Sequence, residues 1–149
     1  MNNFTRIVLS IFLSALLLSC QKPLENAKIS RPIMFFSLVS DPVIDPHPMT
    51  MGLQLANHSL EEGRTVVLFF NVKGVTVPTK NFDENISFHA QPIKKLLTDL
   101  IAKGAQVHVC PHCLEAMGIK SEDLITGAKV TTREGLFSLL NDQSIVFTY

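Results

Sequence analysis

From residue 32 onward, the chain alternates short apolar runs with longer amphipathic segments. The runs have the length and composition of buried strands: 32–40 (PIMFFSLVS), 65–72 (TVVLFFNV), 106–110 (QVHVC), 128–131 (AKVT) and 144–149 (SIVFTY). Nearly continuous apolar runs of this length suit strands that are covered on both faces. They predict a five-stranded sheet.

The segments between these runs carry helical signals. We expect a helix that begins near Pro48, after a loop, and ends at Gly63, since proline fits a first turn and glycine a helix end. A second helix is expected between Pro92 and Gly104. Its apolar stripe consists of Ile93, Leu96, Leu97, Leu100 and Ile101. The segment 73–87, which precedes this helix, is expected to be a long loop.

Shorter helical segments follow the third apolar run. Residues 111–117 are expected to form a short helix, and 121–125 a helical turn capped by Ser121. Thr132 is expected to cap a helix through Leu140. This helix should bury Leu136, Leu139 and Leu140. Alternation of strands and helices is typical of an α/β fold, so we predict a mainly parallel sheet with helices on both faces.

The N-terminus has a different pattern. An uncharged apolar run, 7–18, follows the basic residue Arg6. The run is shorter than the roughly 20 residues that span a bilayer, but it has the length of the apolar part of an export signal, about 7–15 residues. We therefore predict that residues 1–19 are a signal peptide and do not belong to the fold.

A sequence that resembles the bacterial lipobox ends this run: Leu17, Leu18, Ser19 and Cys20. The resemblance implies cleavage before Cys20 and a diacylglycerol thioether on its sulfur. Multiple acyl chains hold a protein on a membrane, because each buried CH₂ contributes about 0.8 kcal/mol. Gln21 follows the cysteine, which resembles the pattern sorted to the outer membrane in Gram-negative bacteria. We expect an exported lipoprotein that faces the periplasm.

Residues 20–31 are polar and lack apolar periodicity. We predict that they are a tether between the lipid and a single domain at 32–149. Ordinary secretion, with an incidental cysteine, is the alternative. The chain has 13 Lys+Arg and 13 Asp+Glu, and this balance argues against a nucleic-acid partner bound through a basic face. Hydrophobic residues make up 46% of the chain and charged residues 17%, which argues against intrinsic disorder.

The candidate chemistry concentrates in the Cys-Pro-His-Cys motif at 110–113, where the third strand should end and a helix begin. Ligand sites in open α/β sheets gather at the carboxyl ends of strands, and a helix N-terminus directs unpaired N–H groups there. Both features favour a thiolate, so the pKa of a cysteine at this junction is expected to fall below the usual value of about 8.5. Cys113 can act as a resolving thiol for Cys110, and His112 can add positive charge between the two sulfurs.

Three uses of these thiols are open. Reactive thiol chemistry follows from the position of the motif and is the preferred hypothesis. A structural disulfide across so short a loop would constrain the unfolded chain by only about 2 kcal/mol. Structural zinc needs four ligands, and no second Cys-x-x-Cys is present. A zinc site would therefore need histidines beside the two cysteines, either His112 or His108 near the motif or the more distant His89 or His47. We predict neither a metal nor a cofactor.

Other polar residues near the strand ends are expected to have structural roles. His108 alternates with two valines along its strand and should be a buried, hydrogen-bonded histidine. His47 and His89 should be solvated loop residues. Asp41, directly before a proline, should form a turn.

Four stretches of the domain together resemble the DsrE/DsrF/TusD-like sulfur-relay family: 69–75 (FFNVKGV), 107–113 (VHVCPHC), 118–119 (GI) and 124–128 (LITGA). The resemblance implies a flavodoxin-like three-layer α/β fold, often assembled as trimers or hexamers of like subunits. It also implies that Cys110 carries sulfur as a persulfide and exchanges it with a donor or acceptor protein. Familiar members work in the cytoplasm, whereas an export signal is predicted for this chain.

The sequence as a whole therefore predicts an exported DsrE-like protein that handles sulfur, or performs thiol redox chemistry, through Cys110. A sulfur carrier of the sulfurtransferase kind and a thiol–disulfide oxidoreductase on the same frame both need this thiol. The remaining alternative is a non-enzymatic binding or assembly module, with a structural disulfide or a metal at the motif.

Overall fold

The structure is a computed structural model of the chain and describes residues 31–149. The predicted signal peptide, Cys20 and all but the last residue of the predicted tether lie outside the described residues, so they stay predictions. Within residues 31–149, we find no helix with the length and hydropathy of a membrane span.

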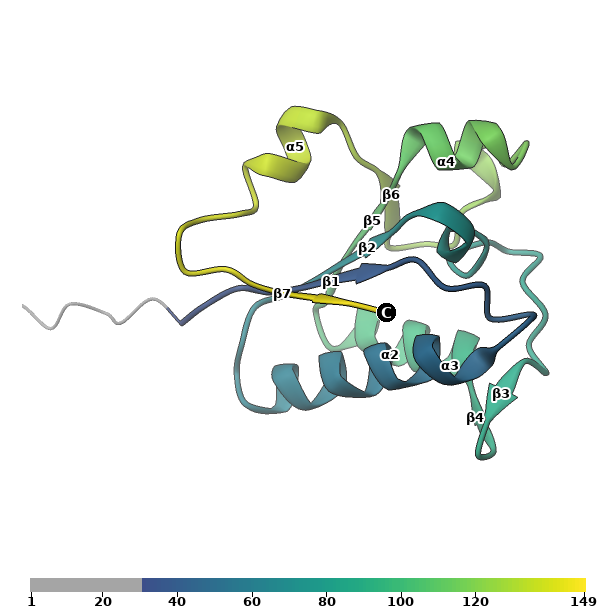
Figure 1. Cartoon of the computed structure of the whole chain (residues 1–149), viewed down its shortest axis with the longest axis horizontal. Helices are drawn as coiled ribbons and strands as arrows, with labels where there is room; N and C mark the ends of the chain where they lie inside the picture. The colour runs from purple at the N-terminus through teal and green to yellow at the C-terminus, as the bar shows by residue number, and fades with distance from the viewer. Residues whose placement is uncertain (1–30) are drawn as a thin grey trace, which may run out of the picture. The chain divides into compact units, whose positions relative to one another are not determined.

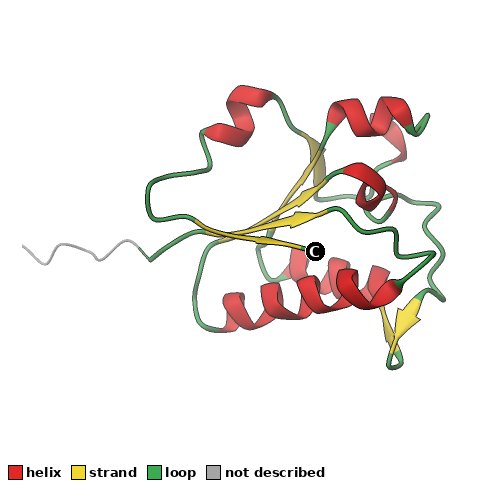
Figure 2. Ribbon diagram, viewed as in Figure 1, coloured by secondary structure: helices red, strands yellow, loops and turns green. Residues whose placement is uncertain are grey.

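Five strands form one sheet (Figure 2). They are β1 (Met34–Leu38), β2 (Val66–Phe70), β5 (Gln106–Val109), β6 (Ala128–Val130) and β7 (Ile145–Thr148). The spatial order is β6-β5-β2-β1-β7, and every neighbouring pair is parallel. The predicted five-stranded α/β fold is confirmed.

Helices lie on both sides of this sheet. The long helices α2 (Pro46–Glu61) and α3 (Ile93–Ala102) pack below it in Figure 1, and the short helices α4 (Pro111–Ala116) and α5 (Arg133–Phe137) lie above it. The three layers match the flavodoxin-like expectation, with a strand order that differs from the 2-1-3-4-5 of flavodoxin. The smaller elements are the 3₁₀ helices η1 (Val72–Thr76) and η2 (Ser121–Asp123) and the hairpin of β3 (Ser87–Phe88) and β4 (Gln91–Pro92).

Side chains alternate between the two faces of the sheet along each strand. The face under α2 and α3, here the α2–α3 face, carries Phe36, Leu68 and Val107, all almost fully buried in the core. From the helices, Leu53 and Leu97 complete this core, and both are also fully buried. Each such side chain contributes about 1.5–3 kcal/mol to the stability of the fold, so this face holds the domain together.

The opposite face, here the α5 face, is covered more thinly. It carries Phe35, Phe69 and His108, and the rings of Phe35 and Phe69 are 6.0 Å apart. Its cover includes α5, whose Phe137 is 64% exposed, and Val146 on the edge strand β7 is 57% exposed. This face is therefore open to solvent at several points.

Two expectations about helix starts are corrected. The loop predicted before Pro48 is the first turn of α2, because the Asp45 carboxylate accepts a hydrogen bond from the backbone N–H of His47 at 3.0 Å and caps the helix two residues earlier. The turn η2 is capped by Lys120, not by Ser121, and the backbone N–H of Lys120 donates to the Asp123 carboxylate.

Two further expectations hold only in part, because tertiary contacts override local signals. The predicted loop 73–87 contains most of η1 and buries apolar side chains, namely Val75, Val77 and Phe82. The hydroxyl of Thr132 caps α5 as predicted, accepting from the backbone N–H of Gly135 at 3.0 Å. However, α5 ends at Phe137, and its leucines are only half-buried: Leu136, and Leu139 and Leu140 beyond the helix end.

Candidate functional site

The junction between β5 and α4 places both cysteines at the carboxyl end of the sheet. Cys110 is the N-cap of α4, and Pro111 occupies the first helical position, where no N–H is needed. The backbone N–H of Cys110 donates to the carbonyl of Phe70 at 3.0 Å. This bond ties the junction to the end of β2, so the predicted strand-to-helix position of the motif is confirmed.

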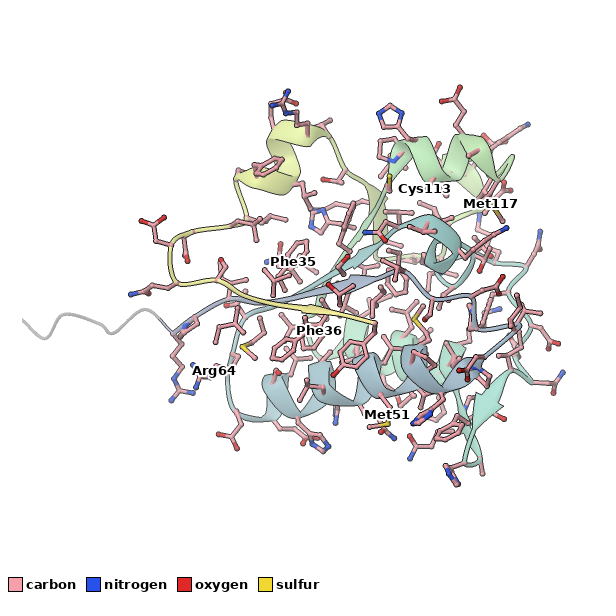
Figure 3. All side chains as sticks on the ribbon, in the orientation of Figure 1. Phe35, Phe36, Met51, Arg64, Cys113 and Met117 are labelled. Carbon is pink, nitrogen blue, oxygen red and sulfur yellow. The ribbon has the colours of Figure 1, made fainter. Side chains whose placement is uncertain are left out.

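The two sulfurs share one environment. Both cysteines are free thiols and half-buried, and their side chains interact with each other. The backbone N–H of Val72 donates to Sγ of Cys113, with an N···S distance of 3.1 Å. Figure 3 shows Cys113 beneath α4, on the side that faces η1 and the sheet. Two thiols are thus brought together with a backbone donor.

The protonation of Cys113 differs from the sequence expectation. Burial raises the pKa of the Cys113 thiol, the neighbouring Cys110 raises it further, and the hydrogen bond from Val72 opposes both without cancelling them. The expectation of a lowered cysteine pKa is therefore wrong for Cys113. This thiol keeps its proton at neutral pH.

The donor residue Val72 has an unusual backbone. Its φ of 51° lies in the left-handed region, which β-branched residues rarely adopt. Such a conformation costs about 1–3 kcal/mol and persists only where the surroundings enforce it. Two residues on, η1 approaches the end of β1 closely, since a Cβ added at Gly74 would lie 2.2 Å from the carbonyl oxygen of Leu38. Sequence reasoning missed Val72, since a valine carries no signal for this backbone.

Further contacts fix η1 against its neighbours. The ammonium of Lys73 lies 3.6 Å from Sδ of Met117, which joins η1 to the end of α4. The side-chain amide of Asn71 donates to the hydroxyl of Ser37 at 3.0 Å, which joins the start of η1 to β1. The Val72 amide is therefore held in place from two sides.

His112 does not take the predicted position between the sulfurs. Its side chain is exposed, and among residues 31–149 no hydrogen bond or ion pair connects it to Cys110 or Cys113. Instead, His112 and Pro111 line a pocket of about 290 Å³ on the α5 face, together with Phe69 and part of 131–137. The structure thus assigns His112 to the surroundings of the thiols and not to direct contact with them.

The prediction that His108 is buried is confirmed, but the prediction that its ring is hydrogen-bonded is wrong. It is 3% exposed, and neither ring nitrogen has a partner among the described residues. Burial lowers the pKa of His108, and the nearby charge of Lys129 lowers it further. His108 is therefore a neutral imidazole at pH 7.

The remaining candidates are structural. His47 lies in the first turn of α2, not in a loop as predicted, and its ring stacks on Phe88 of the hairpin at 4.1 Å. His89 lies in the turn of the β3–β4 hairpin, where Phe88 meets it edge-on at 4.3 Å. The Asp41 carboxylate accepts from the backbone N–H of Val43 at 3.0 Å, which confirms its turn role. In the part of the chain that the structure describes, no three His, Cys, Asp or Glu residues are placed to hold a metal ion. The zinc hypothesis therefore lacks a ligand set there.

The fold and the site together define a small parallel α/β protein with two interacting thiols at the end of a central strand. Residues 34–149 match the DsrE/DsrF-like family. This chain belongs to that family.

Two relatives from archaea resemble the chain in sequence. The uncharacterized protein MJ0989 of Methanocaldococcus jannaschii is 37% identical over 98 residues, which cover 66% of this chain and 83% of that protein. The uncharacterized protein MK0008 of Methanopyrus kandleri is 30% identical over 100 residues, which cover 66% of this chain and 78% of that protein.

Two solved structures resemble the fold. The ychN protein from E. coli has a TM-score of 0.56 at 20% identity, covering 78% of this chain and 99% of that chain. MTH1491 from Methanobacterium thermoautotrophicum, a protein of unknown function, has a TM-score of 0.55 at 16% identity, covering 80% of this chain and 99% of that chain. At these identities the likeness establishes the fold alone.

Proposed function

We propose that this chain is an exported, lipid-anchored sulfur carrier that holds sulfur on Cys110, with Cys113 as its resolving thiol. Membership of the DsrE/DsrF-like family supports a sulfur-relay role in general. The observation that carries the assignment is the pair of free, interacting thiols at the carboxyl end of β5, with the Val72 amide bound to one of them.

The loading step uses Cys110 as the nucleophile. Its thiolate attacks the outer sulfur of a persulfide on a donor protein, the donor S–S bond breaks, and the donor leaves as a thiolate. Cys110 then holds the transferred sulfur as a persulfide. Cys113 stays protonated during this step, because burial raises the pKa of its thiol.

The release step uses Cys113 as the resolving thiol. Once it has lost its proton, Cys113 attacks Sγ of the Cys110 persulfide, a disulfide forms between the two cysteines, and hydrosulfide leaves with the electron pair of the broken S–S bond. A dithiol reductant must then return the disulfide to two thiols. Transfer to an acceptor thiolate, which attacks the outer sulfur, needs no reductant and leaves Cys110 as a thiolate.

The wider setting belongs to the same proposal. A lipid on Cys20 would hold the domain at a membrane surface facing the periplasm, at the outer membrane in a Gram-negative organism. The partners would be this membrane, a sulfur donor or acceptor protein and further copies of the chain in a trimer or hexamer. Nucleic acid is not among them.

The experiment is persulfide mapping on the lipid-bearing protein. After treatment with a low-molecular-weight persulfide, mass spectrometry of the peptide that contains Cys110 should show one added sulfur atom. Cys110→Ser should lose the label, and Cys113→Ser should retain it for longer, because the resolving thiol is gone. A wild-type protein without the label, or label unaffected by Cys110→Ser, would remove the proposal.

A second candidate, a thiol–disulfide oxidoreductase, is favoured by the mutual contact of the two free thiols. The reduction potential of the Cys110–Cys113 pair separates it from a merely structural bridge, which would lie below about −300 mV. Zinc bound in equal amount to protein purified without chelators would instead favour a metal-binding module.

A further inference from the structure

The pocket on the α5 face lies directly beside the reactive junction. Its walls come from three places in the chain: Phe69 of β2, Pro111 and His112 at the start of α4, and residues of 131–137 in and before α5. Cys110 immediately precedes Pro111 and His112, so the pocket adjoins the junction, although neither cysteine is among its lining residues. Its volume of about 290 Å³ is at the lower end of the range for small-molecule pockets.

The floor and sides of the pocket are apolar. Phe69 and Pro111 meet Leu136 and Phe137 across it, and the Phe137 side chain is 64% exposed. A large exposed aromatic side chain beside an apolar recess is an unfavourable arrangement in water, and an apolar group in the recess would cover it. The walls therefore favour a compact apolar body, of the size of one aromatic ring.

The lining is almost entirely apolar, and the polar residues at its edge are His112, Thr131, Thr132 and Arg133. Arg133 lines the pocket and forms no ion pair or side-chain hydrogen bond with any residue in 31–149. None of the lining residues is acidic, and His112 is the only other ionisable one. A guanidinium without a partner, at the edge of an apolar recess, favours an anionic group on the bound molecule.

His108, on the strand next to the floor, is a further unsatisfied group on this face, although it is not among the residues that line the pocket. His108 is the register partner of Phe69 on this same face, and its two buried ring nitrogens have no partner among the described residues. Leaving a buried polar group unpaired costs about 1–3 kcal/mol. Unsatisfied polar groups are retained at functional sites more readily than in a structural core. The hydroxyls of Thr50 and Ser59 on α2 are both paired, whereas the buried hydroxyl of Ser40, beyond the end of β1, has no partner among the described residues.

We propose that this pocket binds the non-reacting part of a small organic thiol, with an apolar ring-sized body against Phe69 and Leu136 and an anionic group at Arg133. The inference rests on the sulfur-carrier function proposed above and names the substrate class for it. The bound thiolate attacks the outer sulfur of the Cys110 persulfide, the S–S bond of that persulfide breaks, Cys110 keeps the electron pair as a thiolate, and the small molecule leaves as a persulfide.

The test uses two aromatic disulfide reagents of similar size and different charge. Dithiobis-nitrobenzoate carries a carboxylate on each ring, whereas dithiodipyridine is neutral; each forms a mixed disulfide with a thiolate and releases one aromatic thiolate. The full chain with Cys113→Ser leaves Cys110 as the domain's reactive thiol, and the rate of its modification is followed by mass spectrometry. The measured quantity is the ratio of the two rates.

Arg133→Gln should lower the rate with the carboxylate reagent by up to about fivefold, as expected for one partly exposed ion pair, and leave the rate with dithiodipyridine unchanged. The side chains introduced by Leu136→Asp and Leu136→Asn have the same shape and differ in charge. Only Leu136→Asp should therefore lower the ratio of the rate with the carboxylate reagent to the rate with dithiodipyridine further. Arg64→Gln is the matched control, because Arg64 lies at the opposite end of the sheet from Cys113 (Figure 3). Circular dichroism checks that each variant is folded.

Two results would overturn the inference. If Cys110 reacts but its rate ratio is the same in wild type, Arg133→Gln and Leu136→Asp, the pocket does not bind an anionic thiol and the sulfur-carrier function stands. A lowered oligomer mass in Leu136→Asp, with an unchanged ratio, would likewise overturn it and identify the face as a contact between copies. If Cys110 reacts with neither reagent nor with iodoacetamide, the carrier function itself fails, and the pocket inference fails with it.

Discussion

The two faces of the sheet differ in how they are covered. The α2–α3 face lies under helices of 16 and 10 residues, and it contains the fully buried side chains of the core. The α5 face lies under helices of six and five residues, and Phe137 and Val146 remain mostly exposed there. The first face provides stability, whereas the second leaves room for a pocket beside the thiols.

The faces also differ in how they treat polar groups. Under α2, the hydroxyls of Thr50 and Ser59 donate to helix carbonyls one turn back, both at 2.8 Å. Both ring nitrogens of His108, on the α5 face, and the side-chain oxygens of Ser40 and Asn71, at the carboxyl end of the sheet, are buried without partners among the described residues. This difference teaches that one sheet can be optimised for packing on one side and keep unsatisfied polar groups for function on the other.

The largest effect should come from removing an aromatic ring on the well-covered face. Phe36 is fully buried and stacks on Phe147 at 5.3 Å. Phe36→Ala should lower the free energy of unfolding by about 3–5 kcal/mol, since the ring leaves a cavity. Phe137→Ala, on the exposed side of α5, should change it by no more than about 0.5 kcal/mol. Urea denaturation measures both, and equal losses would remove the distinction between the faces.

A smaller effect, of opposite sign, is expected at His108. His108→Phe keeps a planar ring beside Phe69 and removes two buried nitrogens without partners, so it should raise the free energy of unfolding by about 1–2 kcal/mol at pH 7. Urea denaturation again provides the measurement. A loss of stability in this variant would mean that the imidazole is satisfied in solution, and the α5 face would then be as well packed as the other.

His108→Phe should also change how the free energy of unfolding depends on pH. Burial, and then the charge of Lys129, lowers the pKa of His108 in the folded state, whereas an unfolded histidine titrates near 6.5. The unfolded chain therefore binds more protons below that pH, so this group contributes stability above about pH 6.5 that is lost as the pH falls through its folded pKa. His108→Phe should weaken this acid-side loss. The exposed His58, substituted by Asn, is the control, and an identical acid limb in wild type and His108→Phe would contradict the assignment.

The positions of the strands and their parallel direction could be predicted from sequence, because they follow from local apolar runs and from the alternation of strands with helices. The apolar run 65–72 contains β2 (Val66–Phe70), and alternation along 106–110 correctly placed His108 opposite its valines. Whether its nitrogens find partners depends on side chains from distant segments, which alternation does not encode. The extent of α5 is a similar case: the leucine spacing fits a longer helix, but the chain turns away after Phe137 to reach β7.

The chemistry of the thiols was harder to predict than their position. The motif placed Cys110 and Cys113 at the end of a strand, as the structure has them. The pKa of Cys113 depends on burial beneath α4 and on contact with Cys110, and these outweigh the single backbone donor. That donor comes from η1, whose position depends on the close approach of Gly74 to Leu38. Neither contact has a local sequence signal.

The smallest expected effect concerns the backbone of Val72. A left-handed conformation costs an L-residue about 1–2 kcal/mol, and glycine avoids this cost but loses about 0.5–1 kcal/mol through the flexibility of the unfolded chain. Val72→Gly should therefore raise the free energy of unfolding by about 0.5–1 kcal/mol at most. Val72→Thr keeps the β-branch and the strain, so it should leave the stability unchanged.

The functional consequence of Val72→Gly should have the opposite sign to its stability gain. The hydrogen bond from residue 72 is the one influence that lowers the pKa of Cys113, and a flexible glycine holds this N–H less firmly against Sγ. In a Cys110→Ser background, alkylation of Cys113 by iodoacetamide at neutral pH should therefore slow by about twofold to threefold, as expected for a partial loss of a hydrogen bond worth about 1 kcal/mol. In the Val72→Thr variant, Cys113 should be alkylated at the wild-type rate. If Val72→Gly instead alkylates as fast as Val72→Thr, the strained amide does not act on the sulfur, and the strain at η1 serves only to connect β2 to the rest of the fold.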